Sequence, residues 1–74
     1  MEEYVAITIN GDSVSGIEPS AMEEQIERKD GKFGSLGSVV NAVAAHGFSL
    51  VRGGIVHNEG NQSTIFMVRE KLAK

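Results

Sequence analysis

The segment Gln62-Ser63-Thr64-Ile65-Phe66-Met67-Val68-Arg69 is a run of strand-forming residues with apolar side chains on both of its faces. Since side chains alternate along a strand, Ile65 and Met67 point to one side, and Phe66 and Val68 point to the other. An antiparallel strand in a two-layer domain usually presents only one apolar face to the core. The second face of this strand therefore needs a cover from elsewhere.

A second strand with the same property is predicted near the N-terminus, over residues 3–9. Its sequence, Glu-Tyr-Val-Ala-Ile-Thr-Ile, is rich in β-branched residues and alternates with period two. One face carries Val5, Ile7 and Ile9, and the opposite face carries Tyr4, Ala6 and Thr8. Asn10-Gly11-Asp12 then ends the strand with residues that favour turns.

A helix is predicted over residues 35–46, where apolar residues recur at helical spacing: Leu36, Val39, Val40 and Val43. Ser35 is a suitable N-cap, and Gly47 is the expected left-handed residue after the helix. The chain then predicts a hairpin, with strands at 48–57 and 62–69 around a loop at 58–61. Gly53-Gly54 indicates a bulge or bend in the first of these strands, and residues 71–74 form a frayed end.

Residues 13–34 leave two interpretations open. Ser20-Ala-Met-Glu23 matches a capping box, which predicts a short helix over about 20–29. Alternatively, Asp30-Gly31 is a favoured two-residue hairpin turn, flanked by Ile26-Glu-Arg-Lys on one side and Lys32-Phe33 on the other.

These elements predict one α+β domain spanning residues 1–74, with the order β-[short α]-α-β-β. The simplest packing is a three-stranded antiparallel sheet on one main helix. A single helix cannot cover both sheet faces, so a second apolar face remains, formed by Tyr4, Ala6, Phe66 and Val68. Either the 20–29 segment or another copy of the chain covers that face, and we expect a homo-oligomer, with a dimer favoured.

Composition restricts the choice of function. The chain has 74 residues, no cysteine and a net charge of −3, so disulfides are excluded and a core of this size contributes only ~3–5 kcal/mol. The acidic start, Glu2-Glu3, and the lack of cysteine favour the cytoplasm. No stretch approaches the ~20 apolar residues of a membrane span, and the acidic balance argues against nucleic acid as a partner.

The charge is unevenly distributed along the chain. Residues 1–27 hold seven acidic residues and no lysine or arginine, giving −7. Residues 28–74 hold seven basic residues against three acidic ones, giving +4, and the two parts sum to −3. Such a split either steers association with a charged partner or is neutralised across one surface.

A small anionic ligand, such as a nucleotide or phosphate, is the alternative function. Its candidate residues are Lys32, Gly34 and Ser35 at the start of the predicted helix, together with Arg52 beside Gly53-Gly54. Phe33 follows the lysine where a P-loop requires serine or threonine. His46 and His57 lack a third ligand at metal-site spacing, and no nucleophile motif is present, so we expect no metal, no cofactor and no catalysis.

Three segments resemble a family of short bacterial and phage domains of unknown function: Glu3-Tyr4-Val5, Ala44-Ala45-His46-Gly47-Phe48-Ser49-Leu50-Val51, and Thr64-Ile65-Phe66-Met67-Val68-Arg69. Phe48 stands where that family usually has tryptophan, and residues 13–34 lie outside the resemblance. It spans roughly half of the chain and implies a small β-α-β-β domain without an activity. The apolar residues on both sheet faces and the lack of catalytic groups instead lead us to expect a non-enzymatic interaction or regulatory module that self-associates and binds a cellular protein.

Overall fold

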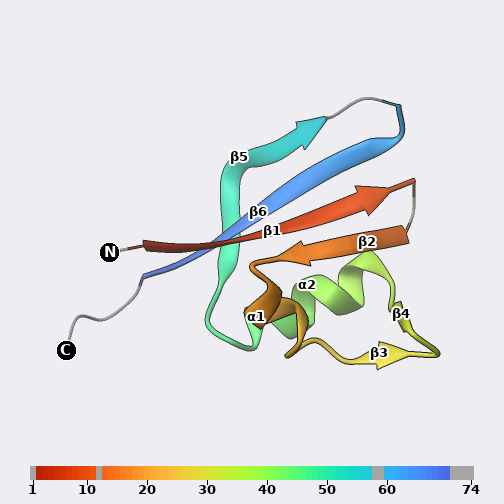
Figure 1. The fold of residues 1–74 in the computed structure, drawn as a ribbon. Helices are drawn as coiled ribbons and strands as arrows, with labels where there is room; N and C mark the ends of the chain where they lie inside the picture. The colour runs from red at the N-terminus through yellow and green to blue at the C-terminus, as the bar shows by residue number, and fades with distance from the viewer. Residues whose placement is uncertain (1, 12, 58–59, 71–74) are drawn as a thin grey trace.

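A four-stranded antiparallel sheet forms the body of the protein, in a computed structural model that describes residues 2–11, 13–57 and 60–70. The strand order is β2-β1-β6-β5, and a separate two-stranded hairpin pairs β3 with β4. Figure 1 shows both helices and this hairpin below the sheet. The elements are β1 (Glu2–Asn10), β2 (Ser13–Glu18), α1 (Ser20–Glu23), β3 (Arg28–Lys29), β4 (Lys32–Phe33), α2 (Leu36–Ala44), β5 (Ser49–His57) and β6 (Gln62–Glu70).

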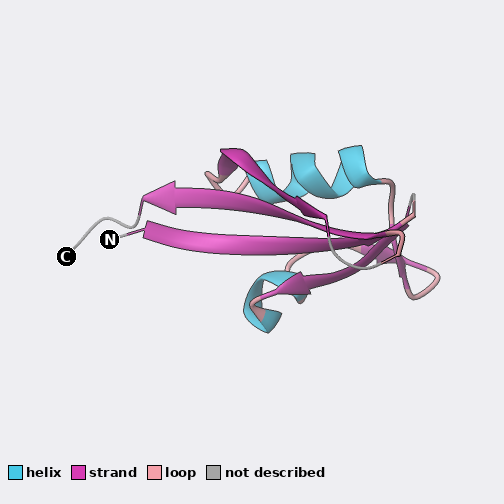
Figure 2. Cartoon of the chain, turned by 90° about the horizontal axis from the view of Figure 1, so that it is seen from above, coloured by secondary structure: helices cyan, strands magenta, loops and turns pink. Residues whose placement is uncertain are grey.

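The two strands with apolar residues on both faces are the central pair of the sheet. Strands β1 and β6 lie side by side along nine residue pairs, from Glu2↔Glu70 to Asn10↔Gln62 (Figure 2). On the helix side, Val5 pairs with Met67 and Ile7 with Ile65, and all four side chains are buried. The predicted strands at 3–9 and 62–69 are confirmed.

The sheet has four strands, so the prediction of three was wrong. The missed strand is β2, in which Val14 and Ile17 are both buried although they are three residues apart. A regular strand would place them on opposite faces. The register with β1 shifts between Gly16 and Val14, leaving Ser15 as an extra residue, and this bulge returns Ile17 to the core side.

Both interpretations of residues 20–33 are right in part. The helix α1 is only four residues long, and a hairpin follows, with Asp30 at φ 55° and Gly31 at φ 74°. The predicted capping box is wrong. Pro19 is the N-cap without a side-chain hydrogen bond, and the Glu23 carboxylate accepts instead from the Ile17 N–H and from Arg28.

The helix α2 has the N-terminus that the sequence predicts, but it ends at Ala44 with Ala45 as its C-cap, two residues before the predicted end. The Ser35 hydroxyl accepts from the Ser38 N–H, and Gly47 follows the helix at φ 93°. Val39 and Val43 point into the core, and Phe48 is buried immediately after the turn. The prediction of a loop at 58–61 falls partly, and that of a frayed end at 71–74 entirely, outside the described residues.

The core lies on one side of the sheet only. Met22 and Ile26, from α1 and the turn after it, join the same buried cluster as Val39 and Val43 of α2. The segment at 20–29 therefore helps to cover the face that α2 already covers. No described helix or strand packs over the opposite face of β1 and β6, which we call the open face.

Candidate functional site

The four residues predicted to form a second apolar face are neighbours on the open face. Tyr4 pairs directly with Val68, and Ala6 pairs with Phe66, so two adjacent cross-strand pairs make one patch. Tyr4 is 53% exposed, and the other three are partly exposed. Cross-strand neighbours of this kind have Cβ atoms about 5 Å apart, which makes the patch continuous.

A carboxylate lies at the rim of this patch. The Tyr4 hydroxyl donates to the Glu2 carboxylate at 3.0 Å. That hydrogen bond, together with the negative charge of Glu2, raises the pKa of Tyr4 above its ordinary value of 10.0. The phenol, neutral at physiological pH with its ordinary pKa, stays protonated to a higher pH in this environment.

The edge strand β5 bends sharply (Figure 1), and its register with β6 shifts between Leu50 and Ile55, the stretch that holds its two glycines. Leu50 pairs with Met67 and Ile55 with Ile65, so four residues of β5 stand opposite Phe66 alone. Gly53 has φ 70°, which favours glycine, and a Cβ on Gly54 would lie 2.7 Å from the Val51 Cβ. The predicted interruption of the strand is thus a bend that requires both glycines.

Exposed aliphatic side chains flank this bend. Leu50, Ile55 and Val56 are 58%, 68% and 47% exposed. Ile55 pairs with buried Ile65 and so points to the side of the sheet that carries α2, but it stays in solvent at the edge of the sheet. The sequence pattern does not reveal these three residues as surface features, because alternation alone does not show how far a helix reaches across a sheet.

The four candidate anion-binding residues do not form one site. The Ser35 hydroxyl is engaged as the α2 cap, and Ser35 bridges Ser13 of β2. Arg52 lies in β5, at the opposite edge of the sheet. Lys32 is exposed on β4, and Gly34 alone of the four lines a nearby pocket.

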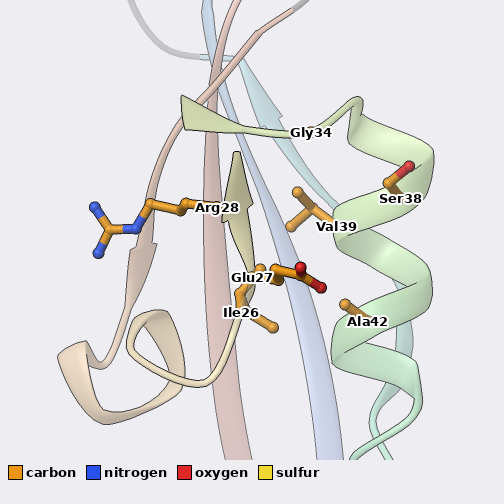
Figure 3. Close-up of a pocket in the computed structure, with 7 residues that line it drawn as sticks. All are labelled: Ile26, Glu27, Arg28, Gly34, Ser38, Val39 and Ala42. Atoms are coloured by element: carbon orange, nitrogen blue, oxygen red, sulfur yellow. The ribbon is translucent and has the colours of Figure 1, made fainter. Parts of the chain in front are cut away.

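That pocket, with a volume of about 530 Å³, separates α2 from the segment around β3. Figure 3 shows the Glu27 carboxylate pointing across it toward α2, whereas the Arg28 guanidinium points away. Arg28 instead pairs with Glu23 at 3.4 Å and lies 5.0 Å from the centre of the Phe33 ring. A carboxylate is thus the nearest charge to the cavity, which disfavours an anionic ligand. The pocket is lined by Ile26, Glu27, Arg28, Gly34, Ser38, Val39 and Ala42.

The histidines lie in separate places. His46 follows α2, where its carbonyl oxygen accepts from Arg69 at 2.7 Å, and His57 ends β5 with its Nδ1 3.5 Å from the Ser63 hydroxyl. Within residues 2–11, 13–57 and 60–70, no three histidine or acidic side chains gather as ligands for a metal ion.

No family model, no curated protein and no solved structure matches the chain. In the described part of the chain, neither helix has the length and apolar character needed to cross a membrane.

Proposed function

We propose that this protein is a non-enzymatic, cytoplasmic interaction module that assembles as a homodimer through its open face and presents its remaining surface to a protein partner. The observation that carries the proposal is the patch formed by the Tyr4–Val68 and Ala6–Phe66 pairs. An apolar sheet face usually packs against a second layer. Both described segments able to supply that layer, α2 and residues 20–33, are used on the other face.

The size of the domain supports association with a second copy. A standard interface buries about 800 Å² on each partner, which is about 15% of the 5328 Å² surface of this chain. Among the described residues the core holds twelve buried hydrophobic side chains, and a core this small gains stability from an added layer. A two-fold axis through the patch would bring identical, self-complementary surfaces together.

The open face is also electrically suited to this contact. Its four patch residues carry no charge at neutral pH, because a tyrosine phenol is protonated there and the other three side chains are apolar. No desolvated charge would therefore oppose the contact at the centre of the patch. The carboxylates of Glu2, its cross-strand partner Glu70, and Glu18 opposite Ala6 border the patch and are exposed, at a rim where a solvated charge costs little.

Sedimentation velocity over tens to hundreds of micromolar tests the proposal. We expect the wild-type chain to sediment as a dimer and both Tyr4→Lys and Phe66→Lys to sediment as monomers, because each places an ammonium group in the contact. Tyr4 is the more exposed of the two, so Tyr4→Lys leaves the fold intact.

Ile55→Lys is the matched control, since it adds the same charge at an exposed aliphatic residue on the other side of the sheet. It is expected to remain dimeric. A wild-type chain that is monomeric throughout this concentration range would refute the proposed assembly.

A further inference from the structure

We infer that the outer edge of β5 binds an extended, acidic segment of a partner protein as an additional strand. The inference rests on the proposed role as an interaction module and names the partner surface and its chemistry. Three features meet at this edge: unpaired backbone, exposed aliphatic side chains and an arginine that makes no ion pair with the described residues.

The two edges of the sheet differ in whether a strand can add to them. At the β2 edge, Ser13 is bridged by Ser35, and the Ile17 N–H donates to the Glu23 carboxylate at 3.3 Å. The helix α1 also packs against β2. Within the described residues, β5 pairs only with β6, so its two regular stretches, Ser49–Leu50 before the bend and Ile55–His57 after it, present free N–H and C=O groups on their other side.

The charge of this edge selects the partner. Arg52 is exposed in the bend of β5 and makes no ion pair with the described residues. Two copies joined edge to edge through β5 would each bring an Arg52 to the shared edge, and these like charges would oppose the pairing. The acidic residues 1–27 of a second copy could not supply the added strand either, because the edge strand in that part of the chain is β2, which is already obstructed. An acidic segment from a different protein meets neither obstacle.

The side chains beside the edge indicate the rest of the ligand. Strand addition obtains its affinity from main-chain hydrogen bonds and its specificity from alternate side chains. Ile55 projects on one side of the sheet and Val56 on the other, and both are largely in solvent. A strand of β-branched residues, such as valine alternating with threonine, would place apolar methyl groups beside both of them, with a carboxylate at its end reaching Arg52.

Fluorescence anisotropy with a defined peptide tests this inference. The probe is a short fluorescein-labelled peptide in which valine alternates with threonine and each end carries glutamate. A second peptide replaces both glutamates with lysine. We expect the wild-type chain to bind the acidic peptide and Arg52→Glu to bind it about tenfold more weakly. The wild-type chain should bind the lysine peptide with a similarly reduced affinity.

Lys32→Glu is the matched control, because it reverses another exposed cation away from β5 and should leave peptide affinity unchanged. Backbone NMR shifts are expected at Ile55 and Val56 and not at Ala6 and Phe66. The inference is overturned if neither peptide binds, if both bind equally, or if the shifts fall on the open face.

Sedimentation of the same variants separates this inference from the proposed dimer. Arg52→Glu should sediment like the wild-type chain, and a loss of self-association in that variant would assign the edge to a second copy and overturn the inference. Conversely, the Tyr4→Lys monomer should still bind the acidic peptide. A monomeric wild-type chain that binds at β5 would refute the dimer and leave the edge site standing.

Discussion

The guanidinium of Arg69 lies 4.4 Å from the centre of the Phe48 ring, and this contact joins the end of the last strand to the residue that follows the turn after the main helix. The same guanidinium donates to the His46 carbonyl at 2.7 Å and to the Glu3 carboxylate at 2.8 Å and 3.1 Å. Arg69 therefore satisfies a carbonyl beyond the C-terminal end of α2 and ties it to β1 through one side chain.

Arg69→Met is expected to lower the free energy of unfolding by about 2 kcal/mol. Methionine keeps the apolar stem but loses the charge-assisted hydrogen bond to His46 and the contact over the ring. The ion pair with Glu3 adds little, since both side chains are 34% exposed. Urea unfolding followed by circular dichroism measures the change.

Arg28→Met is the control for this prediction. Arg28 also lies over a ring, that of Phe33, and also pairs with a glutamate, but it has no hydrogen bond to the backbone. We expect a change of less than about 0.5 kcal/mol. Equal losses in the two variants would show that the helix-end hydrogen bond is not the dominant contribution.

The bend in β5 predicts that the stability of the protein depends strongly on Gly54. An alanine Cβ there would lie 2.7 Å from the Val51 Cβ and 3.0 Å from the Val51 carbonyl oxygen, so the backbone has to move. Gly54→Ala should destabilise the protein by about 2 kcal/mol. Gly16→Ala in β2 is the control, because its Cβ would meet nothing within 4 Å, and its stability should equal or slightly exceed that of the wild type.

The α2 cap predicts that Ser35 and Ser20 differ in their contribution to stability, although the sequence predicts both as helix caps. The Ser35 hydroxyl accepts from the Ser38 N–H, whereas the predicted cap Ser20 lies inside α1, after Pro19. Ser35→Ala should cost about 1 kcal/mol in thermal or urea unfolding. Ser20→Ala should change stability by less than about 0.5 kcal/mol, and a loss as large as that of Ser35→Ala would contradict the assigned caps.

The sequence pattern predicts a helix or strand correctly where that element keeps a regular periodicity. The alternation in β1 and β6 and the spacing of Leu36, Val39 and Val43 identify both central strands and α2. Period two failed in β2 because the extra residue Ser15 changes which face its neighbours occupy. The positive φ values at Asp30-Gly31 fix the hairpin, but its sequence does not reveal that a one-turn helix precedes it.

Surface properties were harder to predict than strands. Tyr4, Ala6, Phe66 and Val68 were predictable as a patch because β1 and β6 are adjacent and their alternation is regular. The exposure of Ile55 depends on where α2 ends relative to the sheet edge, which is a tertiary property. The proximity of Lys32, Gly34 and Ser35 follows from sequence, but the remoteness of Arg52 follows from the strand order.

Tyr4 gives a spectroscopic measure of the open face because it is the only tyrosine in the chain. Its hydrogen bond to Glu2 raises its pKa, so ultraviolet titration should give a midpoint above 10.0. Glu2→Ala should lower that midpoint toward 10.0, whereas Glu18→Ala, which removes an exposed carboxylate from β2, should leave it unchanged.

The effect of the raised Tyr4 pKa on stability follows from the linkage between protonation and folding. A pKa that is raised in the folded state stabilises that state below the unfolded pKa, and this contribution is lost as pH rises through the folded pKa. Dimer formation through the open face would bury the phenol and raise its pKa further. The Tyr4 midpoint should therefore rise with protein concentration in the wild-type chain and stay constant in Phe66→Lys. A concentration-independent midpoint in both proteins would place Tyr4 outside any interface, even if a dimer forms.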